Sequence, residues 1–199
     1  MKERPILFNG AMVRATRAGI KRMTRRVCQG QREQSCAHDF QVDRCPYGRP
    51  GDRLWVRENG WERPERTAKM LREGADTWAP YYYDADGIGD QEAAELKGWG
   101  FKRRPSIHMP RWASRITLEI VDVRVERLHD ISDEDAIAEG IEPDVQPGDC
   151  VPLWRNYLSG GTTVIPRRSF ETLWKTINGA ASWDADPWLW VVEFTPITQ

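Results

Sequence analysis

Gly19-Ile20-Lys21-Arg22-Met23-Thr24-Arg25-Arg26 is the stretch of this 199-residue chain from which a fold can first be inferred. Residues 10–18 before it have the spacing of an amphipathic helix, and Asn9 is a residue type that caps helix N-termini. Gly19 fits the position just after the helix, where the backbone takes a positive φ. We therefore expect residues 21–27 to continue as an extended segment, which carries one ammonium, one hydroxyl and three guanidinium groups.

Further strands and helices are predicted outward from this stretch by the spacing of apolar residues. The predicted strands are residues 5–8, 53–58, 81–83, 114–126 and 187–194, and the predicted helices are residues 10–18, 132–139 and 169–177. These strands and helices do not alternate regularly, which argues against a doubly wound parallel sheet. We predict an α+β fold, a small mixed β-barrel with short flanking helices, in a single domain of residues 1–199. Residues 28–50, 59–110 and 142–167 are predicted to be loop insertions in it.

Several boundaries of these elements have local signals. Ser132 and Ser169 are residue types that favour N-cap positions, so each is expected to begin a helix. The alternating pattern of residues 114–126 changes phase after Val121, which predicts a bulge or bend. Residues 187–194 are almost all apolar, which predicts a strand in the interior of the sheet.

Positive charge is concentrated near the N-terminus, although the net charge of the whole chain is only −1. Residues 1–57 hold 13 Lys and Arg against 5 Asp and Glu, a net charge of +8, and the remainder holds 16 against 25. Such asymmetry can steer a polyanion to one face, although the two halves can also neutralise each other in the fold. We find no apolar run that could span a membrane and no apolar signal region after Met1, so we expect a cytoplasmic protein without a membrane partner.

The four cysteines do not indicate a disulfide scaffold in a chain of this length. Cys28, Cys36, His38 and Cys45 are close in sequence, but their spacing does not match the paired pattern of zinc sites, so we expect this loop to be metal-free. The chain also has no phosphate-binding loop, dinucleotide-binding fingerprint or zinc-protease motif. We therefore expect no cofactor.

The stretch of residues 19–26 fits the pattern G-x-K-x-x-T-x-R and thereby resembles the signature of the ASCH family. ASCH domains are similar to PUA domains, small β-barrels that handle RNA or modified nucleosides, so the resemblance implies a PUA-like barrel. The resemblance covers residues 5–27, 51–58, 114–141 and 169–196, and the three insertions lie outside it. The chain is also similar to proteins encoded by bacteriophages and prophages, which implies a bacterial host.

The resemblance also implies an activity. Some ASCH proteins are small amidohydrolases that remove the acetyl group from N4-acetylcytidine, and others are ribonucleases. By position in the pattern, the catalytic residues of the amidohydrolases match Lys21, Thr24 and Glu139. A lysine of lowered pKa could act as the base for the threonine hydroxyl while the glutamate handles the leaving amine. Those enzymes are about half as long as this chain, so the insertions here affect access to the site.

We expect a ligand site at a barrel mouth formed by Lys21, Thr24, Arg26, Glu58 and Glu139, with single-stranded nucleic acid or a modified nucleoside as the ligand. Arginines bind phosphates, and aromatic rings among basic residues stack on unpaired bases. The candidate nucleic-acid contacts are Arg22, Arg25, Arg26, Arg57, Glu58, Arg103, Arg104 and Trp112.

Three alternatives to this binding site remain open. The same mouth could belong to a metal-independent amidohydrolase or nuclease. Lys21 and Arg26 could simply pair with Glu58 and Glu139. The tryptophan-rich insertions could be the contact surface of a phage assembly protein.

Overall fold

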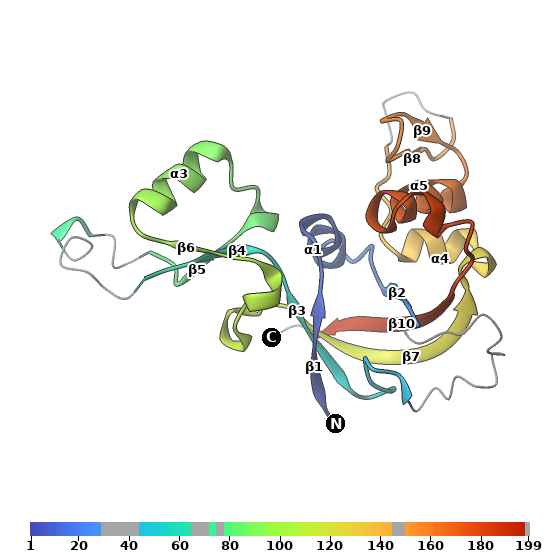
Figure 1. The fold of residues 1–199 in the computed structure, drawn as a ribbon, viewed down its shortest axis with the longest axis horizontal. Helices are drawn as coiled ribbons and strands as arrows, with labels where there is room; N and C mark the ends of the chain where they lie inside the picture. The colour runs from blue at the N-terminus through green and yellow to red at the C-terminus, as the bar shows by residue number, and fades with distance from the viewer. Residues whose placement is uncertain (29–43, 65–71, 75–77, 145–149, 198–199) are drawn as a thin grey trace.

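The computed structural model describes residues 1–28, 44–64, 72–74, 78–144 and 150–197 (Figure 1). It has a mixed α+β fold built around a five-stranded sheet, in the strand order β1-β3-β7-β10-β2. The strands are β1 (Glu3–Leu7), β2 (Met23–Val27), β3 (Arg53–Arg57), β7 (Thr117–Arg127) and β10 (Trp188–Ile197). Only β1 and β3 pair in parallel, and the other neighbours are antiparallel.

The segment after β1 folds as its sequence indicates. The Asn9 side chain accepts a hydrogen bond from the Met12 N–H at the start of α1 (Gly10–Arg17), and Gly19 follows the helix with φ +73°. β2 then joins β10 at one edge of the sheet, while β1 forms the other edge. The predicted helix and extended segment are both confirmed.

The two longest strands, β7 and β10, form the middle of the sheet and curve together (Figure 1). Their pairing shifts register between Glu193 and Phe194, so that Asp122 and Ile120 have partners but Val121 has none. This confirms the bulge predicted at Val121. The predicted interior position of the last strand is also confirmed, because β10 lies between β7 and β2.

Two short helices cover one end of the sheet, α4 (Asp133–Ala138) and α5 (Pro166–Asn178). Ser132 caps α4 as predicted, with its hydroxyl accepting from the Asp135 N–H. The prediction that Ser169 caps the next helix is wrong, because Pro166 already occupies the first turn of α5. Ser169 is buried inside that helix and donates a hydrogen bond to the Arg155 carbonyl of a small hairpin, β8 (Trp154–Arg155) and β9 (Thr162–Thr163).

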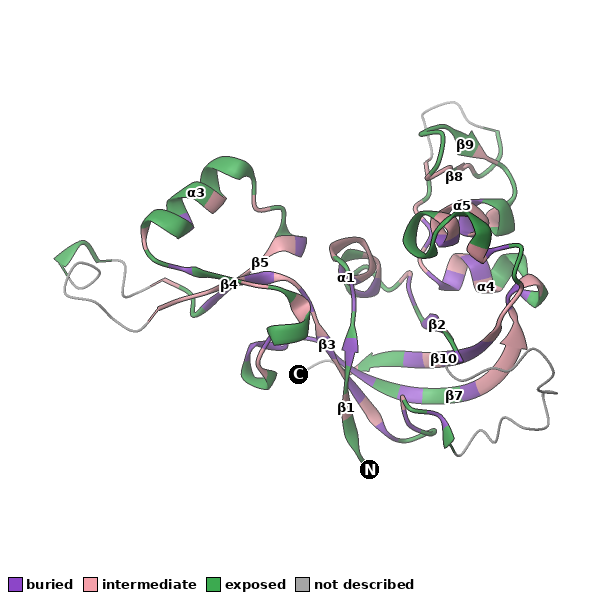
Figure 2. Ribbon diagram, viewed as in Figure 1, coloured by how far each residue is buried: buried purple, intermediate pink, exposed green. Residues whose placement is uncertain are grey.

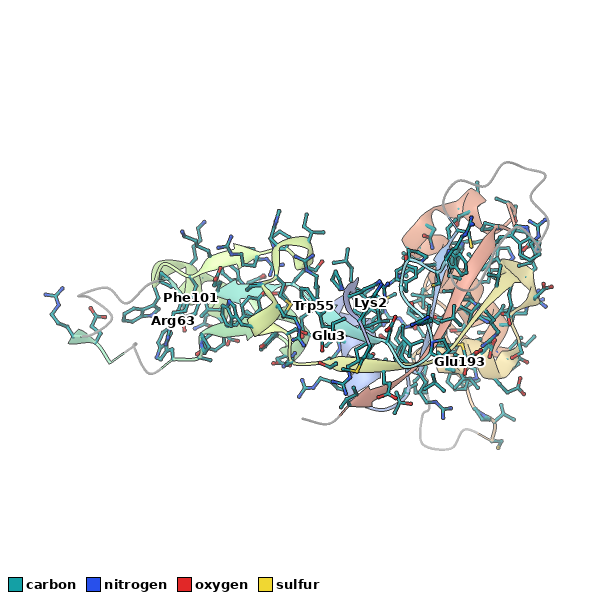
Figure 3. All side chains as sticks on the ribbon, turned by 90° about the horizontal axis from the view of Figure 1, so that it is seen from below. Lys2, Glu3, Trp55, Arg63, Phe101 and Glu193 are labelled. Carbon is teal, nitrogen blue, oxygen red and sulfur yellow. The ribbon has the colours of Figure 1, made fainter. Side chains whose placement is uncertain are left out.

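The chain between β3 and β7 forms a lobe that extends from the main sheet (Figures 1 and 3). Its sheet has the order β5-β4-β6, and its helix is α3 (Asp90–Gly98). The strands are β4 (Gly60–Glu62), β5 (Tyr81–Tyr83) and β6 (Lys102–Arg104). The sequence predicted only the strand at residues 81–83, because β4 and β6 are three residues long and lack a clear pattern.

Buried apolar residues concentrate on the main sheet rather than on the lobe (Figure 2). The larger core lies on the concave face of the sheet and includes Phe8, Leu54, Leu118, Ile120, Val192 and Phe194. A second core joins the sheet to α4 and α5, through residues such as Leu128, Ile141, Phe170, Trp174 and Leu189. Among the described residues, no helix combines the length and apolar character that crossing a membrane requires.

Candidate ligand pocket beside a buried ion pair

Lys21 and Glu139 form an ion pair that is almost closed to solvent. The backbone N–H of Lys21 donates to the Ala15 carbonyl at the end of α1, where Gly19 turns the chain inward. The Lys21 ammonium Nζ donates to the Glu139 carbonyl oxygen at 2.7 Å and to its carboxylate Oε2 at 2.9 Å. The side chains are 0% and 6% exposed, respectively. The two residues that the ASCH resemblance implies as partners are therefore in direct contact.

Burial lowers the pKa of the Lys21 ammonium below its ordinary value. The Glu139 carboxylate opposes this shift by its charge and its hydrogen bond, whereas the nearby Arg26 and Arg25 guanidinium groups add to it. Lys21 can consequently lose its proton at a lower pH than a lysine in water. That property is the one a lysine needs in order to act as a base.

Gly140 is packed directly against this ion pair. It ends α4 with φ +87°, and a Cβ atom added there would lie 2.9 Å from Lys21 Cβ and 3.0 Å from Ala15 Cβ. Gly19 has a similar φ of +73°, but no atom lies within 4 Å of the place where its Cβ would be. The two glycines therefore separate the effect of backbone conformation from the effect of close packing.

We expect Gly140→Ala to lower the free energy of unfolding by more than the roughly 1–2 kcal/mol that a left-handed conformation costs an alanine. Gly19→Ala is the matched control and should cost that backbone term alone, because its Cβ would enter open space. Urea denaturation of both variants measures the difference. Equal losses would show that the chain around Lys21 yields readily to the added methyl group.

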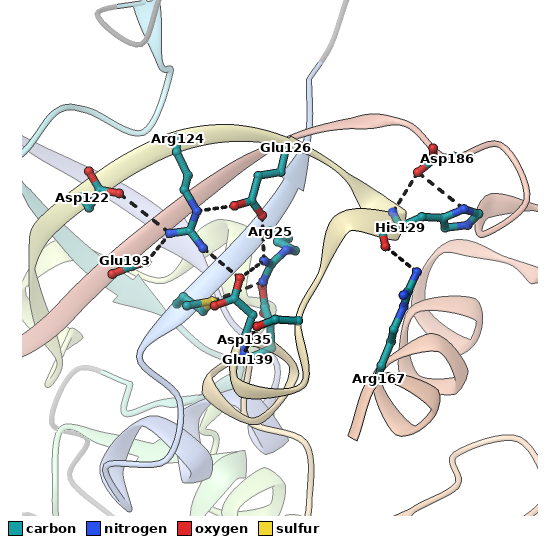
Figure 4. Close-up of polar contacts among 12 residues, drawn as sticks. Arg25, Asp122, Arg124, Glu126, His129, Asp135, Glu139, Arg167, Asp186 and Glu193 are labelled. Carbon is teal, nitrogen blue, oxygen red and sulfur yellow. Dashed lines mark hydrogen bonds and ion pairs between the residues drawn. The ribbon is translucent and has the colours of Figure 1, made fainter. Parts of the chain in front are cut away.

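Arg25 and its neighbour Arg26 point to opposite faces of β2. Carboxylates enclose Arg25, which is buried (Figure 4). Its guanidinium group pairs with Glu126 at 3.0 Å, with Asp135 and with Glu139 at 3.4 Å, and its side chain is 0% exposed. This corrects the assignment of Arg25 as a nucleic-acid contact, because a phosphate could reach it only after the ion pairs were broken. Arg124 extends this network. It pairs with Glu126 and Asp135, which also pair with Arg25, and with two additional carboxylates, Asp122 and Glu193.

Thr24 faces a pocket between α1, β2 and α5, which we term the α1–α5 pocket. Its wall includes Asn9, Met12, Thr24, Arg25, Arg26, Glu139, Tyr157, Phe170, Leu173, Trp174 and Ile177. The Thr24 hydroxyl and the Trp174 indole N–H are both buried and have no hydrogen-bond partner among the described residues. Buried polar atoms nearly always have a partner, so these two atoms are unusual, and both belong to residues of the pocket wall.

The wall of this pocket is part polar and part apolar. It includes the polar residues Thr24, Glu139 and Arg26, and apolar residues of α5 such as Leu173 and Ile177. The cavity volume is about 90 Å³, whereas one water molecule needs about 10–15 Å³ on the same measure. The space suits one ring or an acyl group rather than a polymer.

No protein-family model, curated protein or solved structure matches this chain. A function can therefore be argued only from the chemistry of its own residues.

Glu58, which was predicted to lie at the same mouth, is not part of this pocket. It is 1% exposed, and its two carboxylate oxygens accept from Arg115 at 2.9 and 3.0 Å. Burial raises the pKa of the Glu58 carboxyl, and Arg115 opposes that shift. The prediction of Glu58 as a mouth residue and nucleic-acid contact is corrected, since both oxygens are already used within the fold.

The remaining predicted nucleic-acid contacts do not form one surface around this pocket. Arg103 and Arg104 lie on β6 of the lobe, where they pair with Asp84 and Glu62, respectively. Trp112 is 58% exposed and packs edge-on against Tyr81 of the same lobe.

The arginines of the main sheet also differ in their surroundings. Arg22 is exposed just before β2. Arg26 and Arg57 bind main-chain carbonyl oxygens rather than carboxylates among the described residues. Of the predicted set, Arg26 lines the α1–α5 pocket and has no carboxylate partner within the described ranges, whereas Arg25, which also lines it, is paired with Glu139.

Part of the cysteine cluster lies outside the described residues, namely Cys36 and His38. Cys28 and Cys45 are both buried, and burial raises the pKa of the Cys45 thiol. The expectation of a metal-free loop therefore stays a prediction.

Trp174 and Tyr157 are among the pocket residues that the sequence did not indicate as ligand contacts. Trp174 shares a helical face with Phe170, Leu173 and Ile177, which reads as core packing. The one signal in the sequence was the width of this apolar helix face. The folded chain leaves part of the face uncovered, since Ile177 is 47% exposed.

Proposed function

We propose that this protein is a PUA-like member of the ASCH family that binds a modified nucleoside in the α1–α5 pocket. The observation that carries the proposal is that Thr24 and Trp174, which both line one small cavity, each hold a buried polar atom, Oγ1 and Nε1, without a partner among the described residues. A nucleobase offers hydrogen-bond donors and acceptors around the edge of a flat ring. Such an edge can accept from the indole N–H and exchange a hydrogen bond with the hydroxyl.

The curvature of the main sheet supports a PUA-like barrel. Its two edge strands, β1 and β2, are joined by a side chain, because the Arg26 guanidinium donates to the Leu7 carbonyl oxygen at 2.8 Å. The larger apolar core fills the concave side of the sheet, as it does in a small barrel.

The composition of the pocket supports a nucleoside rather than a simple sugar or an aliphatic acid. Apolar rings and side chains of α5 can cover a flat base, while polar wall residues such as Thr24 and Glu139 can bind its polar edge. An N-acylated cytosine suits such a mixed wall, because it combines a polar pyrimidine edge with an apolar acyl group. This ligand class agrees with the resemblance of residues 19–26 to the ASCH pattern.

The test is the binding of N4-acetylcytidine to wild-type protein and to Thr24→Val, measured by isothermal titration calorimetry. Valine keeps the shape of threonine but removes the hydroxyl. Because Thr24 Oγ1 has no partner in the free protein, its loss should leave the free energy of unfolding unchanged or slightly raised. Affinity should fall by about fivefold, which corresponds to the roughly 1 kcal/mol of one net hydrogen bond.

Thr162→Val is the matched control, because Thr162 is exposed in the β8–β9 hairpin and lines none of the pocket. It should leave affinity unchanged. If wild-type protein does not bind the nucleoside, or if both threonine variants bind equally well, the proposed ligand or the proposed role of Thr24 is wrong.

A second candidate function, a metal-independent amidohydrolase, is favoured by the environment of Lys21. Its pKa is lowered by burial and its ammonium touches Glu139, which in turn lines the pocket with Thr24. Thr24 Oγ1 would attack the acyl carbon, and its proton would pass to the Lys21–Glu139 pair. The pair would return that proton to the cytosine amine as the C–N bond breaks, and water would then hydrolyse the acyl-threonine.

A further inference from the structure

A second groove lies along β1, the edge strand of the main sheet, and we term it the β1 groove. It is lined by Pro5, Ile6, Leu7, Arg26, Tyr47, Arg57 and Ile107, and its volume is about 490 Å³. It is thus larger than the α1–α5 pocket. Leu7 and Ile107 are partly exposed apolar side chains here, at 44% and 55%.

Arg57 is held in this groove without a carboxylate. Its Nη2 donates to the main-chain carbonyls of Ile107 and, at 3.1 Å, of Met109. Its guanidinium also lies 5.2 Å from the centre of the Trp55 ring. These contacts fix the position of the guanidinium but do not neutralise its charge, and its buried Nε–H has no hydrogen-bond partner in the part of the chain that the structure describes.

Arg26 is the second cation of the β1 groove. Its Nη2 donates to the Leu7 carbonyl oxygen, and it forms no ion pair among the residues that the structure describes. By contrast, each of the arginines Arg25, Arg103, Arg104, Arg115 and Arg124 has at least one carboxylate partner. Among the described residues, neither Arg26 nor Arg57 therefore has a carboxylate partner in this groove.

Tyr47 adds an uncharged donor to this groove. Burial raises the pKa of its phenol, an effect that Arg26 opposes, so the hydroxyl keeps its proton at neutral pH. Two guanidinium groups and a phenol are the donor types that bind the oxygens of a phosphate.

The β1 groove and the α1–α5 pocket meet at Arg26, which lines both. Leu7 of the groove and Asn9 of the pocket are also only two residues apart in the chain. The pocket and the groove therefore share the Arg26 side chain as part of their walls.

We propose that the β1 groove is a phosphate subsite, in which Arg57 and Arg26 bind a phosphate attached to the nucleoside in the α1–α5 pocket. This inference rests on the proposed function and narrows its ligand from a free nucleoside to a nucleotide. The phosphate could belong to a mononucleotide or to the phosphodiester of a single strand. Both sources offer the same anionic oxygens to the two guanidinium groups.

The test compares the affinity of N4-acetylcytidine with that of its 5′-monophosphate, its 3′-monophosphate and a short single-stranded oligonucleotide that contains the modified base. The better monophosphate should bind at least about tenfold more tightly than the nucleoside at low salt, because a charge-assisted hydrogen bond contributes about 1.5–3 kcal/mol. That advantage should shrink as salt is raised. It should also largely disappear in Arg57→Gln, whereas the affinity for the free nucleoside should stay unchanged.

Arg168→Gln is the control for the loss of one positive charge, since Arg168 is exposed on α5 and lines neither cavity. It should retain the advantage of the monophosphate. An oligonucleotide that binds more tightly than either monophosphate identifies a strand as the source of the phosphate, and the reverse order identifies a mononucleotide.

Equal affinities for nucleoside and monophosphates, or an advantage that Arg57→Gln keeps, would overturn the subsite while leaving the nucleoside pocket in place. Binding of none of the ligands would overturn both proposals. Inorganic phosphate gives an independent readout, because it should compete with the monophosphate but not with the free nucleoside.

Discussion

Replacing Glu139 by alanine is expected to lower the free energy of unfolding by about 3–5 kcal/mol. The substitution leaves the Lys21 ammonium fully buried, with only the backbone carbonyl of residue 139 as a partner. It also removes one of the three carboxylates around Arg25. A charge that has lost its partner in the interior is among the largest single costs that a substitution can impose. Urea denaturation followed by circular dichroism measures the loss.

A double-mutant cycle separates the ion pair from the individual side chains. Lys21→Met removes the buried charge, so Lys21→Met combined with Glu139→Ala should be less destabilised than the sum of the two single variants. Glu142→Ala serves as the control, because the Glu142–Arg155 pair is 39% and 52% exposed and its loss should have little effect. Additive losses would show that Lys21 and Glu139 stabilise the fold independently of each other.

The parts of the fold that could be predicted from sequence are those with local chemical signals. Asn9 and Ser132 accept hydrogen bonds from backbone N–H groups three residues ahead, and that geometry is contained within one turn of chain. Gly19 has the positive φ that its position after a helix requires. The phase change after Val121 marks a real extra residue in β7.

The predictions that failed depended on contacts distant in sequence. Ser169 has the residue type of an N-cap, but its hydroxyl is used by the Arg155 carbonyl and Pro166 begins the helix instead. Arg25 looks like its neighbours in sequence, yet it points toward the acidic helix α4, whereas Arg26 on the other face of β2 does not. Which arginine is neutralised follows from the packing of α4 on the sheet, and no pattern in residues 19–26 contains that information.

The residues of the candidate site also include some that the sequence analysis placed correctly and others whose position depends on contacts distant in sequence. Contact between Lys21 and Glu139, which are 118 residues apart, was expected both from the family resemblance and from the alternative in which Lys21 only pairs with an acidic residue. Glu58 was placed with them at the end of the predicted strand of residues 53–58, but in the fold it pairs with Arg115. Trp174 was missed because an indole on an apolar helix face is usually packing, and only the folded chain reveals that its N–H is left without a partner.

If the protein is an amidohydrolase, wild-type protein should release acetate from N4-acetylcytidine without added metal, and Thr24→Val should lower kcat/KM by more than about 10³-fold. The reason is that the hydroxyl of Thr24 would form the bond to the acyl carbon, and valine has no atom that can replace it. Lys21→Met should lower kcat by about 10²–10⁴-fold by removing the proton acceptor. Acetate release and cytidine formation are measured together, so that binding without turnover is recognised.

The pH dependence of turnover distinguishes a basic Lys21 from one that only holds Glu139 in place. A base must be neutral before it accepts a proton, so kcat should rise with pH through the pKa of Lys21, at a midpoint below the usual 10.5 because burial lowers that pKa. Thr24→Ser should restore part of the activity that Thr24→Val loses, since it returns the hydroxyl, and Thr162→Val should remain fully active. A flat pH profile would remove Lys21 from the reaction, and turnover that survives in Thr24→Val would assign the attack to water, with Glu139 rather than Thr24 as the residue to pursue.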